Sequence, residues 1–262
     1  MKTAVIQVNA GRDKKKNIEK AVVFIKKAIQ AKARFIVLPE VFNGRFSLRE
    51  AFQNAEDIPG ESLCPLMGLA KENKVFILAG SIYEKATGSK KCFNTSVLID
   101  SKGKIIKKYR KINLFQANVG GVSVREKDVF LPGKRKARSF VEKFCVGLSI
   151  CYDLRFPLMF QNISQKRFDI LCVPSAFTQE TGKAHWEVLL RARAIENFCY
   201  VLAPNQVGKD SRGICSYGNS MIVDPWGKVL ARASNNREEI IYADVSSKVL
   251  KNIRGLFFGK KK

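Results

Sequence analysis

The chain has 262 residues, of which 46% are apolar and 27% charged, proportions typical of a globular protein with a sizeable core. The formal net charge is +24, from 47 Lys and Arg against 23 Asp and Glu. No apolar run approaches the roughly 20 residues that cross a bilayer, and the start of the chain is a poor signal peptide. We therefore expect a cytoplasmic protein with no membrane span, whose cysteines are free thiols.

The positive charge is spread along the chain, with runs at Lys14–Lys16, Lys102–Lys111, Lys134–Arg138 and Lys260–Lys262. Basic surfaces attract anionic ligands or nucleic acid. Because no nucleic-acid-binding motif accompanies the charge, we interpret it as a solvated surface. A nucleic-acid-binding or scaffold protein remains an alternative function.

Strand and helix patterns alternate along the chain without a linker, which predicts one α/β domain over residues 1–262. The expected strands are Thr3–Asn9, Phe35–Leu38, Val75–Gly80, Phe93–Asp100, Cys145–Ile150, Ile170–Val173, Cys199–Ala203, Met221–Val223 and Ile240–Val245. Helices are expected around Ile18–Ile29, Leu69–Asn73 and His185–Phe198, with a turn at Asp224–Gly227. The similar patterns of Phe35–Phe42 and Ile170–Phe177 are as consistent with chance as with duplication.

Two reactive side chains stand just after predicted strands. Glu40 follows Phe35–Leu38, and Cys151 follows Cys145–Ile150. Sites in open α/β sheets gather at the carboxyl ends of strands, so Cys151 is a candidate nucleophile. The remaining cysteines, mostly in apolar runs, are expected to be buried thiols: Cys64, Cys92, Cys145, Cys172, Cys199 and Cys215.

The single histidine, His185, restricts the chemistry available to Cys151. It excludes a zinc site built from several histidines, and a Cys-His dyad would have to use it. Glu40 is an alternative base, and Lys111 is a cation that would favour the thiolate. The chain has no C-x-x-C pair, P-loop or G-x-G-x-x-G loop, so we expect no metal and no organic cofactor.

Three segments resemble the nitrilase superfamily of carbon–nitrogen hydrolases, in the family's order: Leu38-Pro39-Glu40, Tyr109-Arg110-Lys111 and Ile150-Cys151-Tyr152-Asp153. The resemblance covers nearly the whole chain. Its later segments are similar to the amidase branch, which includes omega-amidase and deaminated glutathione amidase: Pro174–Phe177, Thr181–Glu187, Leu190–Asn197, Ala203–Gln206 and Ser220–Gly227. It implies a four-layer α-β-β-α sandwich and a homodimer of stacked sandwiches.

The resemblance also implies roles for individual residues. Glu40 matches the general base, Lys111 the catalytic lysine, Cys151 the nucleophile, and Glu126 a glutamate that positions substrate and lysine. The expected substrate-binding residues are Tyr152, Arg155, Phe177 and Thr181, with Arg155 holding a substrate carboxylate.

Three of these substrate-binding assignments have a structural alternative. Phe177 could simply pack, Thr181 could cap the following helix, and Arg155 could pair with Asp153. The chain departs from the family at Asn113 and Asn219, where members often carry His. Those departures could alter the shape of the pocket or the orientation of Lys111.

The implied function is hydrolysis of a small carboxylate-bearing amide to an acid and ammonia through a Cys151 thioester. Carbamoylase or nitrilase activity on the same scaffold, and a Cys151–His185 hydrolase, are the enzymatic alternatives. We expect the Cys199–Ala203 region and the C-terminal Leu256–Phe258 near the dimer interface, and Lys260–Lys262 to be solvated.

Overall fold

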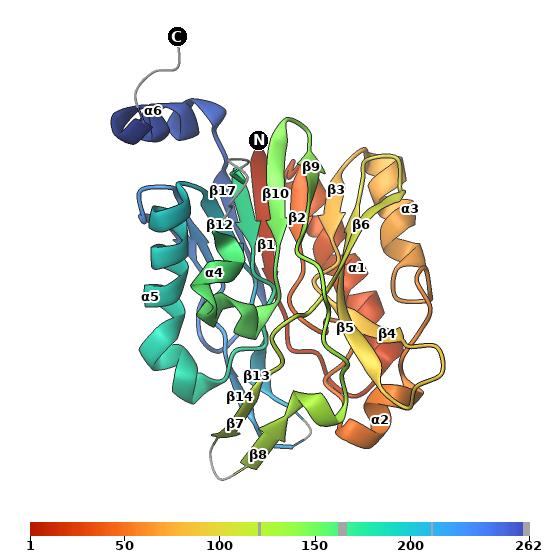
Figure 1. Cartoon of the computed structure of the whole chain (residues 1–262). Coiled ribbons are helices and arrows are strands. Elements are labelled where there is room, and N and C mark those ends of the chain that lie inside the picture. Colours follow the sequence, from red (N-terminus) through yellow and green to blue (C-terminus); the bar gives the residue numbers. More distant parts are fainter. Residues whose placement is uncertain (120–121, 162–166, 211, 259–262) are drawn as a thin grey trace.

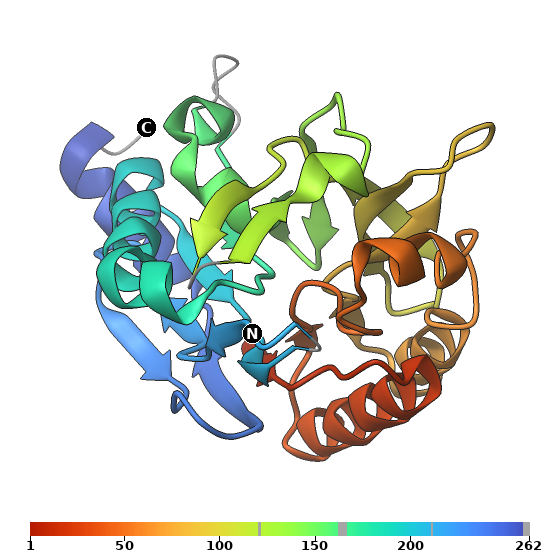
Figure 2. The ribbon, with the colours of Figure 1, turned by 90° about the horizontal axis from the view of Figure 1, so that it is seen from below.

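The computed structural model describes residues 1–119, 122–161, 167–210 and 212–258. Two β-sheets lie face to face with helices on their outer sides, so the expected α-β-β-α sandwich is confirmed (Figures 1 and 2). No helix in these ranges is long and apolar enough to span a bilayer. The basic end, residues 260–262, lies outside the described residues.

The first sheet has a parallel centre with antiparallel strands around it. Its strands are β1 (Lys2–Gln7), β2 (Phe35–Val37), β3 (Phe76–Leu78), β4 (Ile82–Lys85), β5 (Cys92–Ile99), β6 (Ile105–Arg110) and β17 (Glu239–Asp244). Their order is β17-β1-β2-β3-β5-β4, and β6 pairs with β5. Because β1, β2 and β3 are parallel, their carboxyl ends meet at one edge of the sandwich.

The second sheet has the same kind of parallel centre. Its strands are β9 (Ala137–Val141), β10 (Phe144–Leu148), β11 (Ile170–Cys172), β12 (Tyr200–Ala203), β15 (Met221–Val223) and β16 (Val229–Arg232). Their order is β16-β15-β12-β11-β10-β9, with β10, β11 and β12 parallel. Two hairpins are separate from both sheets: β7 (Gln116–Val119) with β8 (Val122–Arg125), and β13 (Val207–Lys209) with β14 (Cys215–Tyr217).

The helices cover the outer faces of the two sheets. They are α1 (Lys14–Gln30), α2 (Leu48–Gln53), α3 (Cys64–Asn73), α4 (Pro157–Phe160), α5 (Gln179–Asn197) and α6 (Ser247–Phe258), with short 3₁₀-helices η1 (Glu126–Asp128) and η2 (Cys151–Arg155). Helices α1 and α3 cover the first sheet, and α5 covers the second (Figure 1). The Asp13 side chain accepts from Lys16 N and caps α1, whose buried face carries Ile18, Ala21 and Ile25 as predicted.

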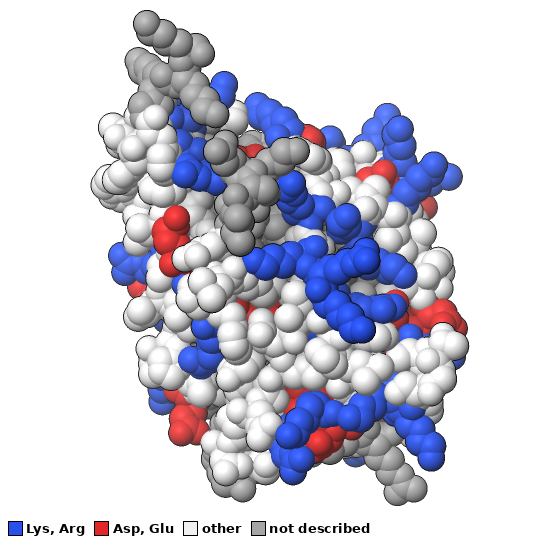
Figure 3. Space-filling view, viewed as in Figure 1, with Lys and Arg blue, Asp and Glu red and all other residues white. Residues whose placement is uncertain are grey.

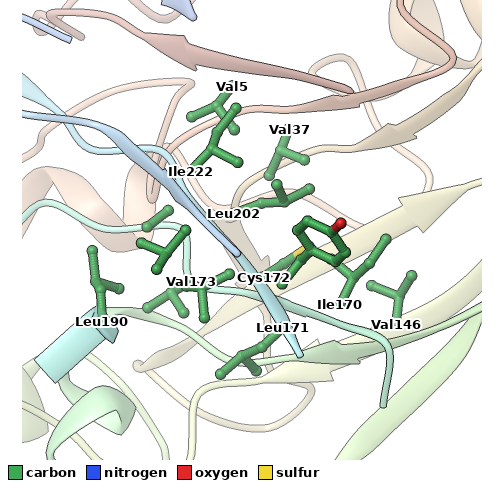
Figure 4. Packing of buried hydrophobic residues seen from close by; sticks show 14 of the residues in the cluster. Val5, Val37, Val146, Ile170, Leu171, Cys172, Val173, Leu190, Leu202 and Ile222 are labelled. Atoms are coloured by element: carbon green, nitrogen blue, oxygen red, sulfur yellow. The ribbon is translucent and has the colours of Figure 1, made fainter. Parts of the chain in front are cut away.

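Strand alternation explains why both faces of each sheet are apolar. In β1, Val5 points to the core between the sheets, whereas Ala4 and Ile6 point to the layer under α1 and α3. Across the central core, Val5 and Val37 of the first sheet face the second sheet (Figure 4). Full burial of one such side chain contributes about 1.5 to 3 kcal/mol.

Helix boundaries differ most from the sequence-based expectations. Helix α5 begins at Gln179, after the extended residue Thr178, so His185 lies inside the helix rather than at its start. Helix α3 begins at Cys64 because Pro65 fits the first turn of a helix.

The Cys199–Ala203 segment, which we expect near the dimer interface, is buried within the second sheet. This segment leads into and forms β12, which is paired on both sides with β11 and β15, and its residues are at most 2% exposed. A strand enclosed in this way offers no surface to a second subunit.

Candidate active site

The carboxyl ends of the central strands of both sheets meet at a solvent-open cavity of about 120 Å³. Glu40 follows β2, and Cys151 follows β10. Both line the cavity, as do Glu126 and the four predicted substrate-binding residues: Tyr152, Arg155, Phe177 and Thr181. The structure therefore brings all of these residues to one place.

Lys111 lies beneath the cavity between two carboxylates. Its Nζ is 2.9 Å from Glu40 Oε1 and 2.8 Å from Glu126 Oε1, and the residue is 1% exposed. Its backbone is held on both sides, because Lys111 N donates to Asn94 O and Gly133 N donates to Lys111 O. Burial alone would lower the pKa of Lys111, but Glu126 and Glu40 outweigh burial and raise the pKa well above its usual value. The side chain is therefore an ammonium.

Each glutamate has further donors that hold it in place. Glu126 Oε2 accepts from Phe115 N at 2.7 Å, and burial raises the pKa of Glu126 despite the opposing effect of Lys111. Glu40 Oε1 accepts from Asn94 Nδ2 at 2.8 Å, and Glu40 Oε2 accepts from Ala176 N at 2.8 Å. The carboxylate of Glu40 is thus oriented by one residue from each sheet.

The sequence-based prediction missed Asn94 and Ala176. Asn94 had one signal, the polar run Asn94-Thr95-Ser96 inside the buried strand β5. Most buried polar side chains have hydrogen-bond partners, and Asn94 and Thr95 donate to Glu40 and Glu84. Ala176 acts through its backbone N–H, so its residue type carries no signal.

Cys151 begins η2 with a φ of 47°, in the left-handed region that non-glycine residues rarely adopt. Its N–H donates to Pro174 O at 2.9 Å, which holds the turn against the end of β11. Burial and then the charge of Glu40 raise the pKa of Cys151 well above its usual value, against the opposite effects of Lys111 and the Ala176 N–H. The resting side chain is therefore a thiol, although Lys111 acts in the expected direction and favours the thiolate.

Asp153 connects the cysteine turn to the segment that carries Lys111. Its Oδ2 accepts from Tyr109 Oη at 2.6 Å and from Ile150 N at 2.9 Å. Its Oδ1 accepts from both N and Nδ2 of Asn113 at 2.9 Å. Asn113, a departure from the family pattern, thus orients Asp153 rather than Lys111.

Comparison with known proteins identifies this arrangement. The family profile described as carbon-nitrogen hydrolase matches residues 2–254. The chain belongs to the carbon–nitrogen hydrolase family.

Relatives of this carbon–nitrogen hydrolase lie in the amidase branch that the motifs predicted. It is 38% identical to omega-amidase NIT2 of Homo sapiens over 96% of this chain and 90% of that protein. It is also 38% identical to deaminated glutathione amidase of Dictyostelium discoideum over 91% of this chain and 85% of the relative. The crystal structure of Saccharomyces cerevisiae Nit3, of branch 10 of the nitrilase superfamily, matches with a TM-score of 0.88 and 31% identity, covering 100% of this chain and 96% of that one.

Arg155 of this hydrolase differs from Arg125 and Arg212, two cavity arginines that pair with aspartates. Its Nη2 lies 3.1 Å from His185 Nδ1, and its guanidinium lies 5.3 Å from the centre of the Phe177 ring. It has no carboxylate partner within the described residues, so the alternative pairing with Asp153 is wrong. By contrast, Arg125 pairs with an aspartate, Asp128, and Arg212 with Asp210.

Arg45 lines the cavity but belongs to none of the motifs found in the sequence. It is 6% exposed and donates only to neutral acceptors, including Ala10 O, Gly208 O, Ser216 Oγ and Lys209 O. Burial lowers its pKa to about 10. Arg45 therefore fastens the hairpin β13–β14 beside the cavity, and its donors are already used.

The remaining predicted residues have structural contacts that limit their roles. Thr181 Oγ1 lies 2.8 Å from Thr178 Oγ1, inside the first turn of α5, so it does not cap the helix. His185 is exposed and does not line the cavity, whereas Glu40 does, which disfavours a Cys151–His185 dyad. Asn219 donates a hydrogen bond to Tyr217 O and accepts one from Arg232, and it lies outside the cavity lining.

The position of Glu40 beside the thiol leads to a measurable expectation. We expect Glu40→Gln to lower the pKa of Cys151, because the charge of Glu40 is the largest cause of its raised pKa after burial. Alkylation of Cys151 by iodoacetamide, followed by peptide mass spectrometry across pH, should then begin at lower pH than in the wild type. The exposed Cys64 is an internal control. An unshifted profile would show that Glu40 does not act on the thiol.

Proposed function

We propose that this carbon–nitrogen hydrolase is an amidase that converts a small carboxylate-bearing amide to an acid and ammonia through a thioester on Cys151. The observation that carries the proposal is the placement of a protonated thiol beside Glu40, which is itself held by Lys111 and the Ala176 N–H. A thiol of raised pKa needs a base for attack, and a hydrogen-bonded carboxylate at its side supplies one.

In the first half of the reaction, Glu40 takes the proton from Cys151 Sγ as sulfur attacks the amide carbon. The resulting oxyanion is stabilised by the Lys111 ammonium and by the Tyr152 N–H. That N–H lies in the first turn of η2, where backbone donors lack intrahelical acceptors. Glu40 then delivers its proton to the nitrogen, the carbon–nitrogen bond breaks, and ammonia leaves a thioester.

In the second half, Glu40 takes a proton from water as the water oxygen attacks the thioester carbon. The carbon–sulfur bond breaks, the acid product forms, and the proton on Glu40 returns to sulfur. Glu126 positions Lys111 throughout, since its Oε1 accepts from Nζ at 2.8 Å. The same carboxylate therefore acts as a base and an acid in both halves.

The substrate class follows from Arg155, at the other end of η2 from Cys151. Arg155 supplies a guanidinium with no carboxylate partner among the described residues, and such a group binds a carboxylate bidentately. An omega-amide would place its acid group there and its amide carbon at Cys151. The names of the two relatives, an omega-amidase and a deaminated glutathione amidase, support this class of substrate.

We expect Cys151→Ala to abolish ammonia release from short omega-amides, because no other group in the cavity lining is a thiol. Loss of one buried sulfur should cost at most about 2 kcal/mol of unfolding free energy, so the variant stays folded. Cys64→Ala is the matched control at an exposed thiol. Turnover that survives in Cys151→Ala, or is lost in Cys64→Ala, would refute the nucleophile assignment.

Arg155→Lys tests the carboxylate site. We expect KM for an alpha-keto acid monoamide to rise about tenfold or more, since a hydrogen bond to a charged group contributes roughly 1.5 to 3 kcal/mol and lysine lacks the bidentate geometry. KM for an uncharged short amide should change little. Steady-state kinetics on both substrates, with a thermal melt of the variant, separate this result from general damage. Equal losses on both substrates would argue against a carboxylate contact.

We also propose a homodimer, with the expected C-terminal segment Leu256–Phe258 in its interface. Helix α6 exposes Leu256, Phe257 and Phe258, and the Phe257 ring lies 6.1 Å from the exposed Trp226. Ile195 of α5 contacts the same turn at Gly227. A contiguous apolar surface of this kind marks an association face.

For the dimer, we expect the double substitution Trp226→Ser and Phe257→Ser to produce monomers at micromolar concentration, measured by light scattering. A matched control is Val23→Ser, which removes an exposed apolar side chain from α1. A wild-type monomer, or a variant that stays dimeric, would contradict this interface.

A further inference from the structure

The net charge of +24 plays no part in the proposed reaction, but the fold concentrates some of it on one face. Figure 3 shows Lys and Arg side chains gathered over the β6 and β9 side of the molecule, with few acidic side chains among them. We call this feature the basic band. Its residues are Lys102, Lys104, Lys107, Lys108, Arg110, Lys134, Arg135 and Lys136, all exposed.

Backbone contacts bring the two halves of the band together. Strand β6 is at an edge of its sheet, since it pairs only with β5. Gly133 N donates to Lys111 O at 2.7 Å, and a Cβ at Gly133 would lie 2.1 Å from Arg110 O. This close approach places Lys134–Lys136 against the end of β6. The band is therefore a property of the fold rather than of one run of sequence.

The charge of the band is poorly neutralised. The segments 101–125 and 129–141 contain no Asp or Glu. Glu84 of β4 pairs with Arg110 at 2.7 Å and with Lys108 at 3.7 Å. Within the described part of the chain, Lys107, Lys134 and Arg135 have no carboxylate within 4.0 Å, the salt-bridge limit. Neighbouring cations without counter-charges create a positive potential that attracts an anion with several charges.

We infer that the basic band binds nucleic acid through its phosphate backbone, without sequence preference. The band joins the β5–β6 turn, strand β6 and the segment Lys134–Lys136, so its cations can meet several phosphates of one linear polyanion. No band residue lines the cavity, so the bound strand leaves the active site open.

The test compares two triple variants of equal charge. Lys107→Gln, Lys134→Gln and Arg135→Gln together remove three cations from the band. Lys15→Gln, Lys26→Gln and Lys71→Gln together remove three exposed cations from α1 and α3 on the outer side of the first sheet. Binding of a fluorescent mixed-sequence single-stranded RNA is measured by anisotropy between about 50 and 200 mM salt. Thermal melts check that both variants are folded.

We expect the wild type to bind the RNA with an affinity that falls steeply with salt. Each phosphate contact contributes about 0.7 to the slope of log affinity against log salt concentration. The loss of three contacts in the band variant should therefore reduce the magnitude of this slope by about 2. It should also weaken RNA binding roughly a hundredfold near 0.1 M salt. The control variant should show a far smaller loss of RNA affinity and of salt dependence. Equal losses in both variants would overturn the inference, because they would show a diffuse effect of net charge.

Two competitors identify the class of partner. Poly-glutamate and vesicles containing phosphatidylserine offer negative charge without a nucleic-acid backbone. We expect both to compete with the RNA only at a much higher concentration of charge than unlabelled RNA does. If either competes as well as RNA at equal charge, or if the wild type does not bind RNA at all, the band is not a nucleic-acid site.

Discussion

The ion pairs of Lys111 are the interaction on which the active site depends. A buried ammonium costs several kcal/mol unless carboxylates and hydrogen bonds compensate it, and here Glu40 and Glu126 do so at 2.9 and 2.8 Å. The two glutamates come from different parts of the chain, after β2 and after the hairpin β7–β8. Removal of either would leave a buried charge without full compensation. Burial of Lys111 therefore requires that the segments carrying Glu40 and Glu126 are both folded around it.

The charges of this cluster explain the state of Cys151. Two carboxylates already face one ammonium, and a thiolate would add another negative charge in a region with little water. This is why the pKa of Cys151 is raised, with burial as the first cause and Glu40 as the second. Attack on the substrate must then be coupled to proton transfer. The exposed cations of the surface do not offset this negative charge, because dissolved salt screens their field over about 8 to 10 Å.

The sequence predicted the layered fold and the main site residues for identifiable reasons. Buried strands such as β2 and β10 are short apolar runs, and Glu40 and Cys151 each come three residues after the end of one of them. Strands such as β4 and β9, with mixed composition, carried no such signal. The missing parts of the site were backbone donors and long-range contacts. From the sequence alone, Arg45 looks like a surface cation. It is buried because the hairpin β13–β14 packs over it.

The two sheets meet at Glu40, and this explains why the active site needs the whole sandwich. Its carboxylate accepts from Asn94 of the first sheet and from Ala176 after β11 of the second. Its backbone oxygen accepts from Gln206 Nε2 after β12, and Gln206 Oε1 in turn accepts from Ala10 N after β1. These hydrogen bonds cross between the sheets at the carboxyl ends of their parallel strands. A shift of one sheet against the other would therefore move the base away from the thiol before it exposed the apolar core.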